Sequence, residues 1–141
     1  MGANAFVKEN PLRKELGLVI NFDGRGNAGP SNMFEVNDKN GWVISEYARS
    51  VAHPSANSLA YEIYKKLPNY TDFSLFKNEG ITGLNNAYID GFANYHSPND
   101  KPQNMDLRSL QHHGDNMLSL VKHFGNLNIT ETKAPDASYF N

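Results

Sequence analysis

Two residues of the sequence combine a reactive side chain with a position that suits metal-assisted chemistry. Asp23 follows a continuous apolar run, Leu16 to Phe22, and His96 lies in a loop after a second apolar run, Leu84 to Ile89. Open α/β sheets place ligands and catalytic groups at the carboxyl ends of their strands. A carboxylate and a neutral imidazole are typical zinc ligands. Spacing alone also allows a simpler interpretation, in which His96 only bonds Asp100 within its loop.

The other candidate residues give weaker signals. His112, His113 and His123 fall on or beside the polar face of a predicted helix near the end of the sequence, so we expect solvated side chains. The glycine-rich stretch 24–30 matches neither of the common phosphate-loop motifs. No serine stands in a nucleophile-elbow sequence. Cysteine is absent, which excludes disulfides, thiolate metal sites and cysteine nucleophiles.

The composition fits one soluble globular domain. The chain has 141 residues, of which 39% are hydrophobic and 20% charged. A formal net charge of −2, without blocks of like charge, argues against nucleic acid or a polybasic membrane surface as the main partner. No apolar run approaches the ~20 residues that cross a bilayer.

Hydropathy patterns predict alternating helices and strands that would position Asp23 and His96. Strands are predicted at 16–22, 32–36 and 84–89, and helices at 4–15 (interrupted at Asn10-Pro11), 42–52, 58–67, 72–78 (capped by Thr71) and 107–124 (capped by Asp106). The strands at 16–22 and 84–89 have the composition of strands buried on both faces. The fold class is therefore α/β, with about three strands and four to five helices. Three strands are few for this length, which suggests part of a larger domain.

The last predicted helix and the segment after it lead to two further expectations. The helix at 107–124 has one apolar stripe, the face that a helix normally turns to the core: Leu107, Leu110, Gly114, Met117 or Leu118, Val121 and Phe124. Residues 126–141 have no strong pattern and are interpreted as an exit segment.

Several short motifs occur in one characteristic order. They are Asn21-Phe22-Asp23-Gly24-Arg25-Gly26, Gly29-Pro30-Ser31-Asn32-Met33-Phe34-Glu35, His53-Pro54, Leu67-Pro68-Asn69-Tyr70-Thr71-Asp72-Phe73, Gly80-Ile81-Thr82-Gly83-Leu84-Asn85, Tyr95-His96-Ser97-Pro98-Asn99-Asp100 and Ser109-Leu110-Gln111-His112-His113-Gly114. This order resembles the dizinc aminopeptidase family that includes bacterial leucyl aminopeptidases, glutamate carboxypeptidase and the transferrin receptor. The vacuolar membrane protease branch and its bacterial relatives are most similar. The resemblance runs from about residue 2 to 141.

The resemblance implies a fold and a role for individual residues. The fold would be part of a three-layer α/β/α sandwich. Asp23 would bind one zinc ion and His96 the other. Tyr95 is similar to a tyrosine that steadies the oxyanion in some members. Thr71-Asp72 resembles a pair that opens a helix near the substrate pocket.

The resemblance also implies that most of the metal site is missing. A family site needs a histidine, a bridging aspartate, a general-base glutamate and a glutamate ligand, all before the position of Asp23. The 22 residues before Asp23 contain no histidine and no Glu-Glu pair. The chain therefore resembles the C-terminal half of a zinc aminopeptidase domain, and two ligands fall short of the three in a catalytic zinc site. We expect the isolated chain to be inactive. The alternative is a non-catalytic binding module, as in the transferrin receptor; the presence of both Asp23 and His96 favours the peptidase.

The same resemblance leads to expectations about partners and location. The parent protein would act on peptides and would be membrane-anchored, with its peptidase domain outside the cytosol. The missing N-terminal half would be the natural partner of this segment. Without it, an apolar strand, 18–22 or 84–89, would have an open edge, which predicts a homodimer.

Overall fold

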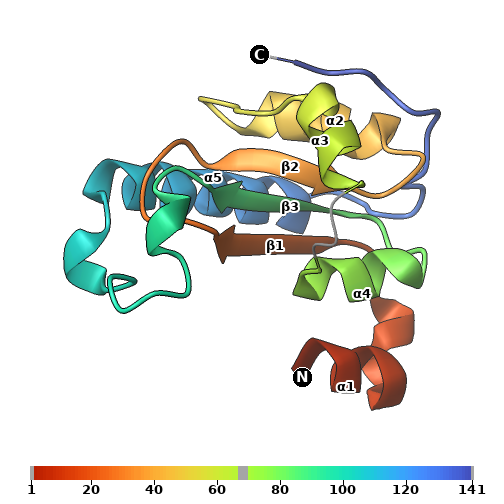
Figure 1. The fold of residues 1–141 in the computed structure, drawn as a ribbon. Coiled ribbons are helices and arrows are strands. Elements are labelled where there is room, and N and C mark those ends of the chain that lie inside the picture. Colours follow the sequence, from red (N-terminus) through yellow and green to blue (C-terminus); the bar gives the residue numbers. More distant parts are fainter. Residues whose placement is uncertain (1, 67–69, 141) are drawn as a thin grey trace.

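The computed structural model describes residues 2–66 and 70–140, which form a small sheet with helices around it (Figure 1). Its α-helices and strands in chain order are α1 (Gly2–Glu9), β1 (Val19–Gly24), β2 (Asn32–Val36), α2 (Gly41–Ser50), α3 (Ser58–Tyr64), α4 (Asp72–Asn78), β3 (Gly83–Tyr88) and α5 (Leu107–Gly125). Three short 3₁₀ helices complete the fold: η1 (Pro11–Glu15), η2 (Phe92–Asn94) and η3 (Pro102–Asn104). The prediction of three strands and up to five helices is confirmed for these residues.

The three strands form one mixed sheet in the order β1-β3-β2. Strand β1 is parallel to β3, with Asp23 beside Ala87, and β2 is antiparallel to β3. Strand β3 is central and five of its six residues are buried. The prediction that the first strand is buried on both faces is wrong, because β1 lies at the sheet edge and its six residues are all half-buried.

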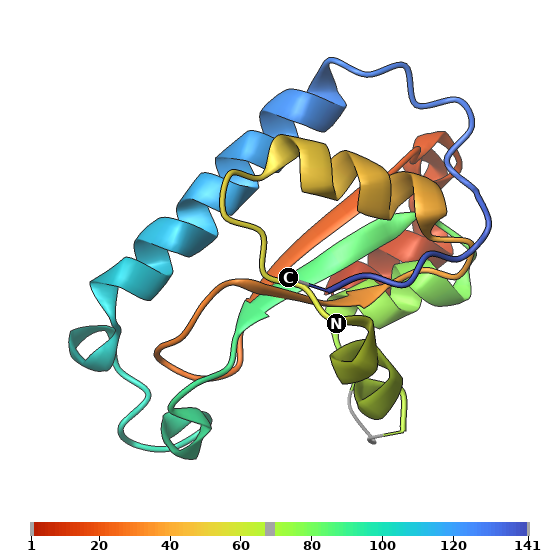
Figure 2. The ribbon, with the colours of Figure 1, turned by 90° about the horizontal axis from the view of Figure 1, so that it is seen from above.

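Helices cover both faces of the sheet. Helices α2 and α5 lie on one side, whereas α4 packs against β1 and β3 and α3 against β2 on the other (Figure 2). This arrangement is the expected partial three-layer α/β/α sandwich. The main core contains Met33 and Val36 of β2, Leu84 of β3 and Leu120 of α5, all fully buried.

Local sequence signals explain where several helices begin and end. The break between α1 and η1 falls at the predicted Asn10-Pro11, where Asn10 Oδ1 accepts a hydrogen bond from Leu12 N at 2.9 Å. Asp106 caps α5 in the same way, accepting from Arg108 N at 2.8 Å. Gly80, with φ +77°, follows α4 in the left-handed conformation that ends many helices.

The face that α5 turns to the sheet differs from the predicted one. The buried residues of this helix are Ser109, His113, Asn116, Leu120 and Phe124. Of the predicted stripe only Phe124 is buried, and the other apolar members are exposed to solvent. The prediction failed because the buried face of α5 includes polar groups that form hydrogen bonds within the protein, and a hydropathy pattern assigns such groups to solvent.

The segment after α5 does not lead away from the domain, contrary to the predicted exit segment. It runs back along the body, where Ala134 pairs with Asn40 and Phe140 pairs with Asn57 in short bridges (Figure 1). Ile129 and Tyr139 pack against the main core. This segment therefore contributes to the packing of the domain.

Candidate metal-binding site

Asp23 and the loop with His96 belong to the same end of the sheet, the end at which the parallel strands β1 and β3 terminate. Asp23 is the fifth residue of β1, and β3 runs beside it in the same direction and ends at Tyr88. From Tyr88 the chain passes through Gly91, with φ +71°, and η2 to reach His96 eight residues later. Asp23 thus lies near the carboxyl end of β1, and His96 follows the carboxyl end of the adjacent parallel strand β3. Open α/β sheets bind ligands at this end of their strands.

The loop holds the backbone of His96 in an uncommon conformation. His96 has φ +56°, a left-handed value that is rare outside glycine and is concentrated at functional sites. Asp100 Oδ2 accepts a hydrogen bond from the His96 backbone N–H at 3.4 Å. The exposed imidazole stacks on the Tyr95 ring, with 3.9 Å between ring centroids. The contact with Asp100 predicted for a purely structural histidine therefore involves the backbone of His96.

The charges on both sides of this edge act on one tyrosine. The pKa of the Tyr88 phenol is raised, mainly by burial and further by the carboxylates of Asp100 and Asp23. Asp23 and Asp100, which is in the loop with His96, therefore both act on the same phenol.

Asp23 and His96 have side chains of the kinds that bind zinc. Carboxylate and imidazole are the donor types that zinc prefers, so Asp23 and His96 fit such an ion chemically. Within residues 2–66 and 70–140, however, no group of three or more His, Cys, Asp or Glu side chains is placed to hold a metal. Any ion bound here needs further ligands beyond this pair.

An apolar cavity of about 420 Å³ adjoins this edge. Its lining includes Phe34, Ile63, Tyr64, Ile89, Phe92 and Tyr95, with Arg25 as its charged member. Arg25 Nη1 lies 3.4 Å from the Tyr64 hydroxyl. A largely apolar cavity with a few polar groups is the usual form of a small-ligand site. Sequence analysis did not identify it, because a bulge at β2 and four separate segments bring these side chains together.

The predicted pair Thr71-Asp72 lies at the start of α4, and the two side chains differ in their burial. Thr71 is buried and its Oγ1 accepts a hydrogen bond from Asn85 Nδ2 at 3.0 Å, whereas Asp72 is exposed. Ser74 Oγ accepts from the Thr71 N–H at 3.1 Å, which completes a capping box. A role of this pair near substrate stays a prediction.

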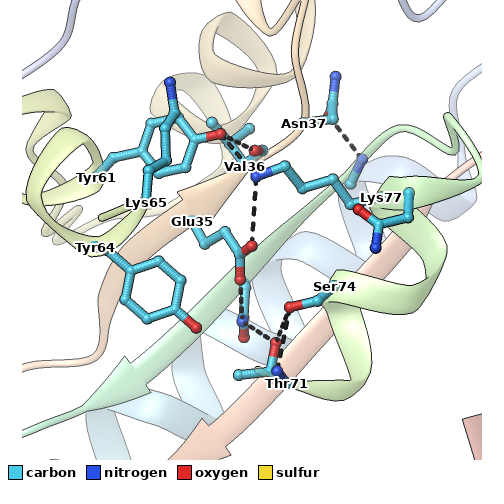
Figure 3. A network of polar contacts seen from close by, with 12 residues as sticks. Glu35, Val36, Asn37, Tyr61, Tyr64, Lys65, Thr71, Ser74 and Lys77 are labelled. Atoms are coloured by element: carbon cyan, nitrogen blue, oxygen red, sulfur yellow. Dashed lines mark hydrogen bonds and ion pairs between the residues drawn. The ribbon is translucent and has the colours of Figure 1, made fainter. Parts of the chain in front are cut away.

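A polar network behind the cavity connects the sheet to α3 and α4 (Figure 3). Glu35, only 4% exposed, accepts from Asn85 Nδ2 at 3.0 Å and lies 3.4 Å from Lys77 Nζ. Lys77 also donates to the Tyr61 hydroxyl at 2.9 Å, and that hydroxyl donates to Val36 O at 2.7 Å. Burial raises the pKa of Tyr61 to about 12, so the phenol stays protonated. The network fixes α3, which provides one wall of the cavity.

The histidines of α5 are structural, which corrects the prediction that they are solvated. His113 is 8% exposed, and its Nδ1 lies 2.7 Å from the buried Ser31 Oγ. His112 Nδ1 accepts from the Ser31 N–H at 3.2 Å, so its proton is on Nε2, which donates to His53 O at 2.8 Å. His123 Nε2 contacts Glu46 at 2.7 Å. These bonds attach α5 to the segment between β1 and β2, to α2 and to the residues after α2.

The mixed sheet with helices on both faces defines the class of the chain as an α/β fold. The sequence profile of peptidase family M28 matches residues 1–121. The chain belongs to this family, which confirms the resemblance given by the motifs.

Individual relatives agree with this assignment. The chain is 31% identical over 123 residues to a putative endoplasmic reticulum metallopeptidase 1-A of Caenorhabditis elegans, covering 85% of this chain and 14% of that protein. It is 28% identical over 140 residues to endoplasmic reticulum metallopeptidase 1 of Mus musculus, covering 97% and 15%. It is 29% identical over 133 residues to the vacuolar membrane protease of Candida dubliniensis, covering 93% and 14%. No solved structure matches significantly.

The chain is much shorter than these relatives. It spans about one seventh of their length, 14–15% in the three comparisons above. Their names place them at the endoplasmic reticulum or the vacuolar membrane. Among the described residues, no helix has the length and apolar character needed to cross a bilayer.

Proposed function

We propose that this chain forms part of the active site of a zinc-dependent M28 peptidase, in which Asp23 and His96 each bind one of two zinc ions. The observation that supports the proposal is the pairing of the parallel strands β1 and β3, because Asp23 is the fifth residue of β1 and the loop with His96 follows β3. The family assignment and the metallopeptidase names of relatives support it. The parent would belong to a membrane compartment, as its relatives do.

The residues around this pair have distinct roles in the proposal. When bound, zinc supplies a water of lowered pKa and polarises the scissile carbonyl. Asp23 and His96 hold the ions, and the left-handed backbone at His96 directs the imidazole. Tyr95, stacked on His96, would donate a hydrogen bond to a substrate oxyanion. The general base and the remaining ligands must come from outside the described residues.

The cavity beside Tyr95 suggests where a substrate side chain would bind. Its walls are aromatic and aliphatic, so an apolar side chain would release water on entering. The guanidinium of Arg25 lies 5.8 Å from the centre of the Tyr64 ring, a cation–π contact that fixes one wall. We therefore propose peptides with an apolar residue beside the scissile bond as the substrate class.

Metal binding by the chain itself tests the ligand assignment. Cobalt(II) is a paramagnetic substitute for zinc, and its addition should broaden the amide NMR signals around Asp23 and His96. Asp23→Asn and His96→Gln should each remove this broadening, because each variant loses a donor. His53→Gln, which changes another exposed histidine, is the matched control and should leave it unchanged. Broadening centred elsewhere, or unchanged in both site variants, contradicts the assignment.

Activity distinguishes a partial site from a complete one. The isolated chain should hydrolyse no aminoacyl-anilide with added zinc, because two ligands do not complete a catalytic centre. Zinc-dependent turnover that His96→Ala abolishes would show that the missing ligands come from a source within this chain. Absence of metal binding together with absence of turnover would instead favour the non-catalytic binding module.

A further inference from the structure

The apolar cavity beside Tyr95 has a charged side chain in its wall. Among the described residues that line it, Arg25 is the charged one, and the others are aromatic or aliphatic. A charged group in apolar surroundings costs free energy unless an opposite charge or hydrogen bonds compensate it. The ligand that complements such a wall has an apolar body and a negative charge.

Two residues of this wall are close in sequence to the proposed metal ligands. Arg25 follows Asp23 by two residues, and its backbone N–H donates to Tyr88 O at 3.1 Å, which continues the pairing of β1 with β3. Tyr95, which directly precedes His96, lines the same cavity. A ligand in the cavity would therefore lie at the end of the sheet to which both proposed ligands belong.

Aromatic rings hold the guanidinium of Arg25 in place. It lies 5.8 Å from the centre of the Tyr64 ring, and its Nη1 is 3.4 Å from the Tyr64 hydroxyl. Tyr64 in turn meets Phe34 edge to face, with ring centroids 4.8 Å apart. Because a guanidinium has several N–H donors in one plane, it can contact Tyr64 and a carboxylate at the same time.

The groups around Tyr64 leave the positive charge of this wall in place. Burial raises the pKa of the Tyr64 phenol, so the hydroxyl beside Arg25 stays neutral. The buried Glu35, beside Tyr64 in Figure 3, lies 3.4 Å from Lys77 Nζ and accepts from Asn85 Nδ2 at 3.0 Å. Lys77 therefore balances the charge of this carboxylate.

The size of the cavity suits more than one apolar side chain. Its volume of about 420 Å³ lies within the range of roughly 300–1,000 Å³ that is usual for pockets that bind small molecules. An apolar side chain alone would remove water from the guanidinium of Arg25 without giving it an anionic partner. A residue that also has a carboxylate supplies this partner.

We propose that the cavity binds a substrate residue with a carboxylate on an apolar body, and that Arg25 determines this specificity. The inference rests on the proposed peptidase function and narrows its substrate class. The carboxylate can be the free α-carboxylate of a short peptide or the end of an acidic side chain, because both pair with a guanidinium in the same way. A lysine or arginine side chain would be rejected by like charge.

Two pairs of small probes, each pair differing in one charge, test the proposal on the metal-free chain in EDTA. N-acetyl-leucine and N-acetyl-leucinamide compare an α-carboxylate with a neutral amide. N-acetyl-isoglutamine and N-acetyl-glutaminamide make the same comparison for a side chain. In at least one pair the carboxylate should bind about tenfold more tightly than the amide, measured from the amide NMR shifts of Tyr64, Ile89 and Phe92. The pair that shows the preference identifies the source of the carboxylate.

Substitutions assign the preference to one side chain. Arg25→Met keeps an apolar stem and removes the charge, so carboxylate and amide should bind equally. Arg25→Lys should retain a weaker preference, because the charge remains but the planar group is lost. Arg49→Met is the matched control and should keep the full preference, since that side chain is 68% exposed and lies on α2, across the sheet from α3 (Figure 2). Ala60→Phe, at an exposed position of the cavity wall, should weaken the binding of all four probes.

Several results would overturn the proposal. They are a carboxylate that binds no better than its amide in both pairs, a preference that persists in Arg25→Met, and NMR shifts that Ala60→Phe leaves unchanged. Equal loss of all probes in Arg25→Met and Arg25→Lys would overturn it too, because Arg25 would then only support the wall. The cobalt experiment tests Asp23 and His96 separately, so a failure of the specificity and a failure of the metal site can be told apart.

Discussion

Asn85 and Asn86 are neighbours on the central strand, and both are fully buried. Asn85 donates to Glu35 and to Thr71, each at 3.0 Å, and accepts from Asn21 Nδ2 at 2.8 Å. The side-chain nitrogen and oxygen of Asn86 have no hydrogen-bond partner among the described residues. A buried amide without partners costs about 1–3 kcal/mol, so two adjacent residues of one type have opposite effects on stability.

Replacement of each asparagine by leucine should separate these effects. We expect Asn86→Leu to raise the free energy of unfolding by about 1–2 kcal/mol, because it removes an unpaired amide. Asn85→Leu should lower it by about 3 kcal/mol, because Glu35 would lose a donor while it remains buried. Urea denaturation followed by circular dichroism measures both values. Destabilisation of similar size in both variants would mean that Asn86 has a partner.

His113 should make the stability of the protein depend on pH. Burial lowers its pKa below 6.5, the neighbouring His112 lowers the pKa further, and the Asp23 carboxylate offsets only part of this shift. The folded state therefore favours the neutral ring, whereas the unfolded chain takes up a proton at about its ordinary pKa. This contribution to stability is complete above about pH 6.5 and is lost as the pH falls from there towards the lower folded-state pKa.

The melting temperature should thus fall between pH 7.5 and 5.5, and the fall should be smaller in His113→Gln. His53→Gln changes a histidine exposed to solvent and should retain the full pH dependence. Differential scanning fluorimetry at several pH values provides the comparison. The same pH dependence in His113→Gln and the unmodified chain would contradict the assignment.

At the scale of elements, the return of the chain after α5 depends on one close backbone contact. Helix α2 begins at Gly41, and a Cβ atom there would lie 2.2 Å from the carbonyl oxygen of Pro135. Next to it, the side chain of Asn40 accepts from Ala137 N at 2.9 Å, and its backbone N–H donates to Asp136 at 3.1 Å. The start of α2 therefore holds the segment 126–140 against the domain.

Gly41→Ala should lower the free energy of unfolding by about 1–3 kcal/mol, because the backbone of Pro135 must move. Gly125→Ala is the matched control: it is also a helical glycine, but its Cβ would meet nothing within 4 Å. Alanine there should be neutral or stabilising by up to about 1 kcal/mol. Thermal denaturation of both variants tests the contact, and stabilisation by both changes would refute it.

At the scale of the whole molecule, one core unites most elements and leaves α1 outside. The core combines residues of β2, α2, α3, β3 and α5 with Ile129 and Tyr139. Helix α1 packs mainly on α4, where Phe6 meets Phe76 with ring centroids 6.1 Å apart. The molecule should therefore unfold in one main transition, with α1 held less strongly.

Two measurements test this division. Fluorescence of Trp42, the single tryptophan, and far-UV circular dichroism should show the same urea midpoint, since Trp42 packs against the core. Amide hydrogens of α1 should exchange faster than those of α5, because fewer buried contacts protect them. Different midpoints, or equal protection of α1 and α5, would indicate another division of the fold.

Sequence by itself determined the kinds and order of the elements, because periodicity and caps act within a few residues. The break at Asn10-Pro11 and the caps at Thr71 and Asp106 are local in this sense, and all three are observed. The order of the motifs likewise indicated the family, because it can be recognised in the sequence without knowledge of tertiary contacts. The assignment of Asp23 and His96 as metal ligands stays a prediction. It rests on their positions in and after the parallel strands β1 and β3.

Tertiary structure decided the properties that depend on distant neighbours. Periodicity cannot show that β1 lies at an edge, because a strand of the same composition is buried when it has two neighbours. Nor can it assign the face of α5, where Ser31, far away in sequence, bonds His113 and so turns a polar face inward. The apolar cavity and the return of residues 126–140 along the domain likewise depend on contacts between residues far apart in the sequence. Long-range contacts choose among faces that are locally equivalent, and only the folded chain contains them.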